Sequence, residues 1–184
     1  DFLMASLDWT PKDLDRIVVA EGPGSYTGLR IAVATAKTLA HTLNIELVGM
    51  SSLLALLPNQ QEGLVVPLMD ARRNNVYAGF YEHAQPVFPE AHLSFEEVLE
   101  QVKDADQVTF VGEVGAFIEQ IQEQLPQANY QETLPNAANL ALWAWDKKAD
   151  SLHDFVPNYL KRVEAEENWL KNHTESGESY IKRL

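Results

Sequence analysis

The chain has 184 residues and a formal net charge of −13, with 14 Lys and Arg against 27 Asp and Glu. This charge argues against strong direct binding of RNA, because affinity for nucleic acid depends on clustered cations that neutralise phosphates. The composition includes no cysteine, which excludes a disulfide scaffold and a cysteine-based metal site and suits the cytoplasm, and no apolar run approaches the roughly 20 residues of a membrane-spanning helix.

In the first third of the chain, apolar runs and turn residues predict two strands and three helices. The strands are expected at residues 16–20 and 45–49, and the helices at residues 10–13, 27–43 and 51–57. Pro58 ends the last of these helices, and the polar stretch 59–63 that follows is the expected boundary between two lobes.

The rest of the chain continues the alternation. Strands are expected at residues 64–69, 76–81 and 108–112, and the first two form a hairpin around a polar turn. A capping box, Ser94 with Glu97, opens one helix, an apolar face with Phe117, Ile121 and Leu125 marks a second, and Asn136 caps a third that runs to about Asp150. Strands alternating with helices predict an α/β fold, and the hairpin makes its sheet mixed.

The most informative run joins the strand at 16–20 to the helix that follows it. It reads Glu21, Gly22, Pro23, Gly24, Ser25, Tyr26, Thr27, Gly28, Leu29, Arg30. Such a turn can cradle an anion on the unpaired N–H groups of the helix, or allow another backbone to approach closely. Its spacing fits neither a Walker loop, nor a dinucleotide fingerprint, nor a nucleophile elbow. Spacing alone therefore favours a tight turn in which Ser25 or Thr27 caps the helix.

The whole run resembles the GPGSFTGLRIG signature of the bacterial TsaB (YeaZ) family. Two further runs match that family in the same order, at residues 70–78 (DARRNNVYA) and 157–162 (PNYLKR), the latter followed by Glu164 and Glu166. The resemblance implies the two-lobed fold of actin, hexokinase and heat-shock ATPases (the ASKHA fold), with mixed sheets. It also implies an incomplete first lobe, because two paired strands of that fold are expected before Asp1.

The lobes are expected at the following residues: 1–57 for the remainder of the first lobe with its docking helices, 58–158 for the second lobe, and 159–184 for a charged tail that can return to the first lobe.

The resemblance implies a non-catalytic subunit needed for threonylcarbamoyladenosine in tRNA. TsaB is similar to TsaD, the transferase, which binds its metal through an HxxxH motif. By a rough alignment Met50 and Leu54 take the histidine positions here, and neither side chain can replace an imidazole on a hard metal. No catalytic or metal site is therefore expected.

The implied partners are a TsaD-like transferase and a TsaE-like ATPase, with a homodimer when the chain is alone. The negative charge, the lack of a long apolar run and the lack of cysteine lead us to expect no strong tRNA binding by this chain, no membrane and a cytoplasmic location. The resemblance implies no tightly bound cofactor and allows an adenine nucleotide at the partner interface.

The helix at 27–43 is apolar or small on two sides, which predicts burial on both. One stripe holds Leu29, Val33, Ala36, Ala40 and Leu43, and the other holds Ile31, Ala34, Thr35 and Thr38. The first is expected to pack on its own sheet. The second is either covered by the strands expected before Asp1 or by the helix at 51–57, or it is a docking face. We expect the docking face, joined by Leu53, Leu54 and Leu57.

Two smaller features have two interpretations each. Asp70, Arg72 and Arg73 on the hairpin turn either contact a charged partner or anionic ligand, or form a surface ion pair of little energetic value. Gly112 and Gly115 flank a turn that in this superfamily can approach an adenine nucleotide, although a plain turn is favoured.

Three other functions remain as alternatives: a phosphotransferase of the same fold with Asp70 as its only candidate base, a glycoprotease-like peptidase, and a self-associating module without an enzyme partner. The peptidase is disfavoured because the sequence has no zinc motif, no cysteine and no serine elbow.

Overall fold

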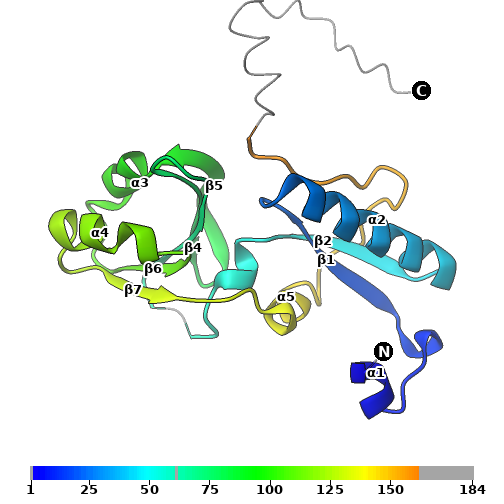
Figure 1. Cartoon of the computed structure of the whole chain (residues 1–184). Helices are drawn as coiled ribbons and strands as arrows, with labels where there is room; N and C mark the ends of the chain where they lie inside the picture. Colours follow the sequence, from blue (N-terminus) through cyan, green and yellow to red (C-terminus); the bar gives the residue numbers. More distant parts are fainter. Residues whose placement is uncertain (1, 61, 162–184) are drawn as a thin grey trace, which may run out of the picture.

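A computed structural model describes residues 2–60 and 62–161 of the chain, arranged around two sheets that lie side by side (Figure 1). The expected charged tail lies outside the described residues from residue 162 onward. The first elements are α1 (Phe2–Ser6), η1 (Pro11–Asp13), β1 (Arg16–Gly22), α2 (Tyr26–Leu43), β2 (Glu46–Ser51) and η2 (Leu54–Leu56). The helix expected at 51–57 is thus only the short 3₁₀ helix η2.

The first sheet consists of the parallel strands β1 and β2, connected by α2. Successive side chains of a strand point to opposite faces. On β2, Leu47 accordingly packs with Val33 and Ala40 of α2, whereas Val48 packs on the opposite face with Leu140. Figure 1 shows α2 and α5 on the two sides of this sheet. Both faces of the first sheet are therefore covered, which explains the continuous apolar runs in its strands.

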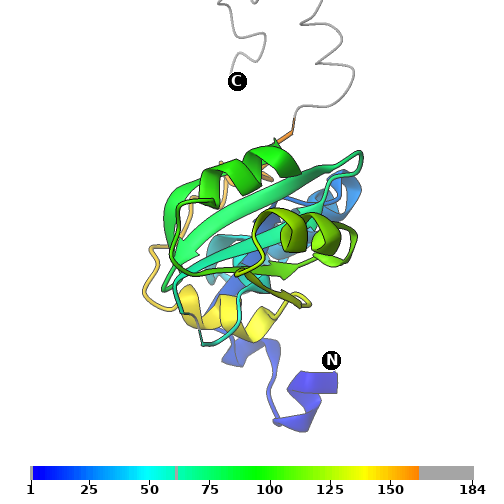
Figure 2. The ribbon, with the colours of Figure 1, turned by 90° about the vertical axis from the view of Figure 1, so that its left-hand side faces the viewer.

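The second sheet has five strands in the order β5-β4-β3-β6-β7. Its elements are β3 (Leu64–Asp70), β4 (Asn75–Glu82), β5 (Gln85–Ser94), α3 (Phe95–Val102), β6 (Val108–Gly112), η3 (Gly115–Phe117), α4 (Ile118–Gln124) and β7 (Asn129–Glu132). Strand β3 pairs antiparallel with β4 and parallel with β6, so the predicted mixed sheet is confirmed. Figure 2 shows α3 and α4 on one face of this sheet, where Phe95, Phe110 and Ile121 form the centre of the larger core.

The chain returns to the first sheet earlier than the sequence suggested. Helix α5 (Ala137–Trp143) is capped by Asn136 as predicted, but it ends well before Asp150. The segment that follows, residues 150–159, is called the C-terminal strap below. The backbone N–H of Asp150 donates to the carbonyl of Leu47 at 2.8 Å, and that of Asn158 donates to the carbonyl of Glu21 at 2.8 Å. The residues expected to belong wholly to the second lobe thus pack on the first sheet from α5 onward.

Across residues 2–60 and 62–161, every helix is too short or too polar to cross a membrane.

Candidate functional site

The signature turn, residues 21–30, holds the C-terminal strap against the first sheet. Gly22 has a φ of +140°, and a Cβ placed on it would lie 2.1 Å from the carbonyl oxygen of Asn158. The carbonyl of Gly22 also accepts a hydrogen bond from the N–H of Ser52 at 2.8 Å. A glycine is therefore required here both by its backbone conformation and by the close approach of another chain segment. Pro23 beside it is buried.

The first turn of α2 is filled by the protein's own side chains. The Oγ atom of Ser25 accepts a hydrogen bond from the N–H of Gly28 at 3.4 Å, which confirms Ser25 as the helix cap. Tyr26 stacks on Tyr159 of the strap with ring centroids 5.0 Å apart. Arg30 donates a hydrogen bond to the Tyr26 hydroxyl at 2.7 Å and lies over its ring. The first and third family-like runs of the sequence therefore meet in space.

Helix α2 has one buried side and one exposed side. Leu29, Val33, Ala36 and Ala40 are buried against the first sheet, as predicted. The second stripe is exposed; it is called the α2 outer face below and comprises Ile31, Ala34, Thr35 and Thr38. Ile31 is 63% exposed. The Thr38 hydroxyl donates to the carbonyl of Ala34 at 2.8 Å, so the polar group of this threonine is satisfied within the helix.

The α2 outer face extends further than the sequence stripe suggested. Leu39 lies one turn after Thr35 and is 48% exposed, although its neighbours Ala36 and Ala40 are buried. An i, i+4 count from Thr35 would have found it. The result is a mostly small, weakly polar surface with Ile31 and Leu39 as its large apolar side chains. Small residues allow a second helix axis to come close.

The expectation that Leu53 and Leu57 join the docking face is wrong, because both side chains are buried inside the chain. Their side chains are 0% and 2% exposed and pack with Val65, Tyr81 and Val111 of the second sheet. Leu54 is half-buried and contacts two of the apolar clusters. The physical reason is that η2 connects the two sheets, so its leucines fill the space between them. Among the described residues expected to form the docking face, the exposed ones therefore all lie on α2.

The β3–β4 turn, residues 71–74, places Asp70, Arg72 and Arg73 as neighbours but does not pair them. Asp70 accepts through Oδ1 a hydrogen bond from the backbone N–H of Arg72 at 2.7 Å, so this carboxylate holds the turn. Among residues 2–60 and 62–161, no carboxylate forms an ion pair with either guanidinium, whereas Arg16 pairs with Glu46 at 2.5 Å. The ion-pair interpretation of this turn is therefore not supported in the part of the chain that the structure describes.

A pocket of about 650 Å³ lies beside this turn, at the start of the glycine-flanked segment after β6. It is lined by Asp70, Gly112, Glu113, Gly115, Ala116, Glu132, Thr133 and Leu134. Glu113 also accepts a hydrogen bond from the N–H of Asp70 at 2.7 Å. The charged side chains of the lining are all carboxylates, which repel phosphate groups. The pocket by itself thus does not fit the phosphates of a nucleotide.

A group of carboxylates lies where β1, the strap and the second sheet meet. Asp150 accepts a hydrogen bond from the N–H of Gly49 at 2.7 Å, and a Cβ on Gly49 would lie 2.5 Å from Oε2 of Glu21. Burial raises the pKa of Glu21, and the neighbouring carboxylates of Asp150 and Glu90 raise it further, while Lys147 opposes them. Glu90 accepts a hydrogen bond from the Tyr81 hydroxyl. Burial, then Glu90, raises the pKa of that hydroxyl.

The positions aligned with the metal-binding histidines are apolar and packed. Met50 is 3% exposed in β2 and clusters with Ala55, Leu140 and Ala144, and Leu54 of η2 packs against the same cluster. Within the described ranges, no three His, Asp or Glu side chains are placed to hold a metal ion.

Comparison with known proteins gives three consistent likenesses. The family described as TsaD, tRNA N6-adenosine threonylcarbamoyltransferase, matches residues 1–169. The tRNA threonylcarbamoyladenosine biosynthesis protein TsaB of Bacillus subtilis (strain 168) is 38% identical in an alignment of 182 positions, and the match covers 92% of this chain and 80% of the relative. An uncharacterized protein of Mycobacterium bovis is 32% identical over 163 residues, which is 88% of this chain and 71% of the relative.

Solved structures agree with the sequence relatives. YeaZ from Pseudomonas aeruginosa superimposes with a TM-score of 0.69 at 27% identity, over 86% of this chain and 79% of that chain. A crystal structure of an uncharacterized Pseudomonas aeruginosa protein, described as similar to peptidase YEAZ, gives a TM-score of 0.71 at 26% identity over 87% of this chain and 80% of that chain. These likenesses confirm the predicted mixed α/β fold of the ASKHA type.

Proposed function

We propose that this chain, which belongs to the TsaB (YeaZ) family of tRNA threonylcarbamoyladenosine biosynthesis proteins, is a non-catalytic scaffold that activates a TsaD-like transferase. It binds the transferase through the α2 outer face and holds it in its working form, and a TsaE-like ATPase joins the assembly. The observation that carries this proposal is the exposure of Ile31, Ala34, Thr35 and Thr38 on a helix whose opposite side is buried.

The shape of the α2 outer face supports a helix as its binding partner. Ala34, Thr35 and Thr38 have short side chains, so a second helix approaches closely enough for backbone and side chains to pack together. Ile31 and Leu39 supply the apolar area whose removal from water drives association. The same face serves a homodimer when the transferase is absent, because a two-fold pairing places α2 of one copy against α2 of the other.

The proposal assigns the transfer chemistry and its metal to the partner. The apolar packing of Met50 and Leu54 at the aligned histidine positions supports this division, since a thioether and an alkyl group are poor ligands for a hard catalytic metal. The rival phosphotransferase would need Asp70 as a free base near a phosphate. Asp70 instead accepts from the N–H of Arg72, beside the carboxylates of Glu113 and Glu132.

The proposal also covers nucleotide binding, tRNA binding and the location of the assembly. With Asp70, Glu113 and Glu132 lining the pocket after β6, we expect this chain to bind no nucleotide tightly by itself. A nucleotide at the interface would need cations from the partner. We also propose that the partner binds the tRNA, which the net charge of −13 on this chain supports, and that the assembly is cytoplasmic.

Reconstitution tests the proposed function. Purified TsaD-like transferase and TsaE-like ATPase are incubated with tRNA, an activated threonylcarbamoyl donor and ATP, with and without this chain, and modified adenosine is measured by mass spectrometry. We expect product with the full set, a loss of at least about tenfold without the chain, and none with the chain alone. Product from the chain alone, or an unchanged yield without it, would contradict the proposal.

A further inference from the structure

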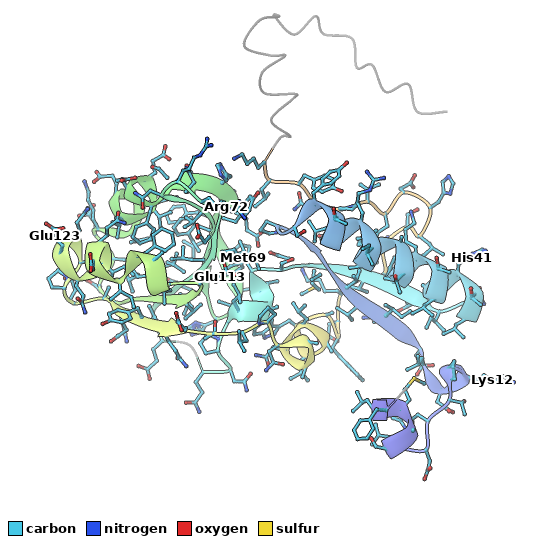
Figure 3. All side chains as sticks on the ribbon, in the orientation of Figure 1. Lys12, His41, Met69, Arg72, Glu113 and Glu123 are labelled. Atoms are coloured by element: carbon cyan, nitrogen blue, oxygen red, sulfur yellow. The ribbon has the colours of Figure 1, made fainter. Side chains whose placement is uncertain are left out.

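We infer that the β3–β4 turn is a second interaction surface, which binds carboxylates of a protein partner through the guanidinium groups of Arg72 and Arg73. The inference rests on the proposed function, because the partner is taken to be a protein of the same assembly. The turn belongs to the second sheet, whereas the α2 outer face belongs to the first. Figure 3 shows Arg72 at the upper edge of the second sheet, on the side toward α2.

The backbone of this turn is strained by the residues that it carries. Arg72, Arg73 and Asn74 have consecutive positive φ values of 67°, 54° and 56°. A side chain with a Cβ disfavours this left-handed conformation, asparagine less than arginine, and glycine adopts it freely. Two arginines therefore occupy positions where glycine would cost less. Strain of this kind is commonly kept where the side chains act on a partner.

The turn is also fixed on three sides. Asp70 accepts from the N–H of Arg72 at 2.7 Å, and the Asn75 amide donates to the carbonyl of Arg73 at 2.8 Å. The Asn74 amide donates to Glu96 of α3 at 2.5 Å. The two guanidinium groups thus extend from a backbone that is already ordered, which lowers the entropy lost when a partner binds.

No residue in the described part of the chain occupies either guanidinium group by an ion pair. Arg72 and Arg73 are exposed, and no carboxylate of residues 2–60 or 62–161 pairs with either. The other described arginines differ, since Arg16 pairs with Glu46 and Arg30 donates to Tyr26. Within residues 2–60 and 62–161, two neighbouring arginines without an ion-pair partner are thus a local exception in a chain of net charge −13.

The surroundings of the turn favour protein carboxylates over RNA phosphates. Asp70, Glu96 and Glu113 contact the turn or its flanking strand, and their charges repel a polyanion. Binding of an RNA backbone needs a larger cluster of cations. A guanidinium instead matches a single carboxylate with two parallel hydrogen bonds, a geometry that lysine cannot reproduce.

The test measures affinity of the full chain for the transferase and for the ATPase, each separately, by calorimetry at two salt concentrations. The double variant R72G/R73G removes both guanidinium groups and relieves the backbone. We expect its Kd for one of the two proteins to rise about tenfold or more, with a weaker salt dependence and a melting temperature no lower than that of the original chain. R72K/R73K should recover only part of the affinity. K12A/K148A, which removes two cations elsewhere, should bind as the original chain does.

Four outcomes would overturn the inference. Unchanged affinity of R72G/R73G for both proteins removes the contact, and full recovery by R72K/R73K removes the paired geometry. Weaker tRNA retention by the assembly, with protein affinities unchanged, assigns the turn to RNA instead. If the original chain binds neither protein, the proposed function fails and takes this inference with it, whereas failure of the variant arm alone leaves the proposed function standing.

Discussion

The carbonyl oxygen of Asn158 lies against the Cα atom of Gly22, only 2.1 Å from where a Cβ on that glycine would be. This contact joins two segments that are far apart in the sequence, the signature turn and the C-terminal strap. It is reinforced by the hydrogen bond from the N–H of Asn158 to the carbonyl of Glu21 and by the stacking of Tyr26 on Tyr159. Lys37 of α2 also contacts the strap, because its ammonium group donates a hydrogen bond to the carbonyl of Phe155 at 2.8 Å. The strap therefore fixes the start of α2, on which the proposed docking face depends.

Replacing Gly22 by alanine should destabilise the fold strongly. The new Cβ would collide with a backbone carbonyl, and alanine resists a φ of +140°. We expect a loss of roughly 2–4 kcal/mol in the free energy of unfolding, measured by denaturant titration. Gly24→Ala is the matched control, because a Cβ there meets Leu29 at an ordinary distance of 3.6 Å. Equal stabilities for the two variants would contradict this account of the turn.

The stack of Tyr26 on Tyr159 should contribute measurable coupling energy. A double-mutant cycle with Tyr26→Ala and Tyr159→Ala should give a coupling of about 0.5–1.5 kcal/mol, which is typical of an aromatic pair. Hydrogen exchange in the strap should rise in either single variant. Tyr130→Ala serves as control, because the Tyr130 hydroxyl on β7 accepts a hydrogen bond from Gln122 of α4, away from the strap. The effects of Tyr130→Ala and Tyr26→Ala should therefore be additive. Additivity of the strap pair itself would show that the rings do not interact.

The carboxyl of Glu21 should make stability depend on pH. Burial, then Asp150 and Glu90, raises its folded-state pKa above the usual 4.5, so the folded chain holds this proton more tightly than the unfolded chain. Stability therefore falls as the pH rises from about 4.5 through the raised pKa. Glu21→Gln cannot ionise and should raise the melting temperature at pH 8 but not at pH 4.

The size of this effect is small because Glu21 is only half-buried and solvent screens its neighbours. Glu123→Gln, on an exposed position of α4, is the control and should shift the melting temperature little at either pH. A shift of equal size at pH 4 and pH 8 for Glu21→Gln would exclude titration as its cause.

Helices and strands could be predicted from the sequence where the local residue pattern agrees with the packing in the fold. The β-branched run of β1, the small and apolar stripe of α2 and the capping box of α3 each specify an element by itself, and each is present. Strand β5 was not predicted because it contains Pro86 and Pro89, which are tolerated only because β5 lies at an edge of its sheet. Strand β7 was missed because its residues are polar and exposed.

The candidate site was predictable only in part, because some of its residues are placed by contacts with distant parts of the chain. The exposed stripe of α2 follows from helical periodicity, so Ile31 and Ala34 could be placed from the sequence. The fate of Leu53 and Leu57 could not, because their burial depends on a sheet formed by residues that follow them. The contact between Gly22 and Asn158 joins positions 136 residues apart, and no local pattern indicates it.

The central claim is that the α2 outer face binds the transferase, and the affinity of Ala34→Arg tests it most directly. Ala34 is exposed, so the variant should fold with an unchanged melting temperature, while an arginine in a close helix contact should weaken binding about 100-fold or more. Ala138→Arg, on the exposed side of α5, adds the same charge and should bind normally. The account predicts that calorimetry finds lost affinity for Ala34→Arg alone; equal affinity of Ala34→Arg and the original chain would contradict it.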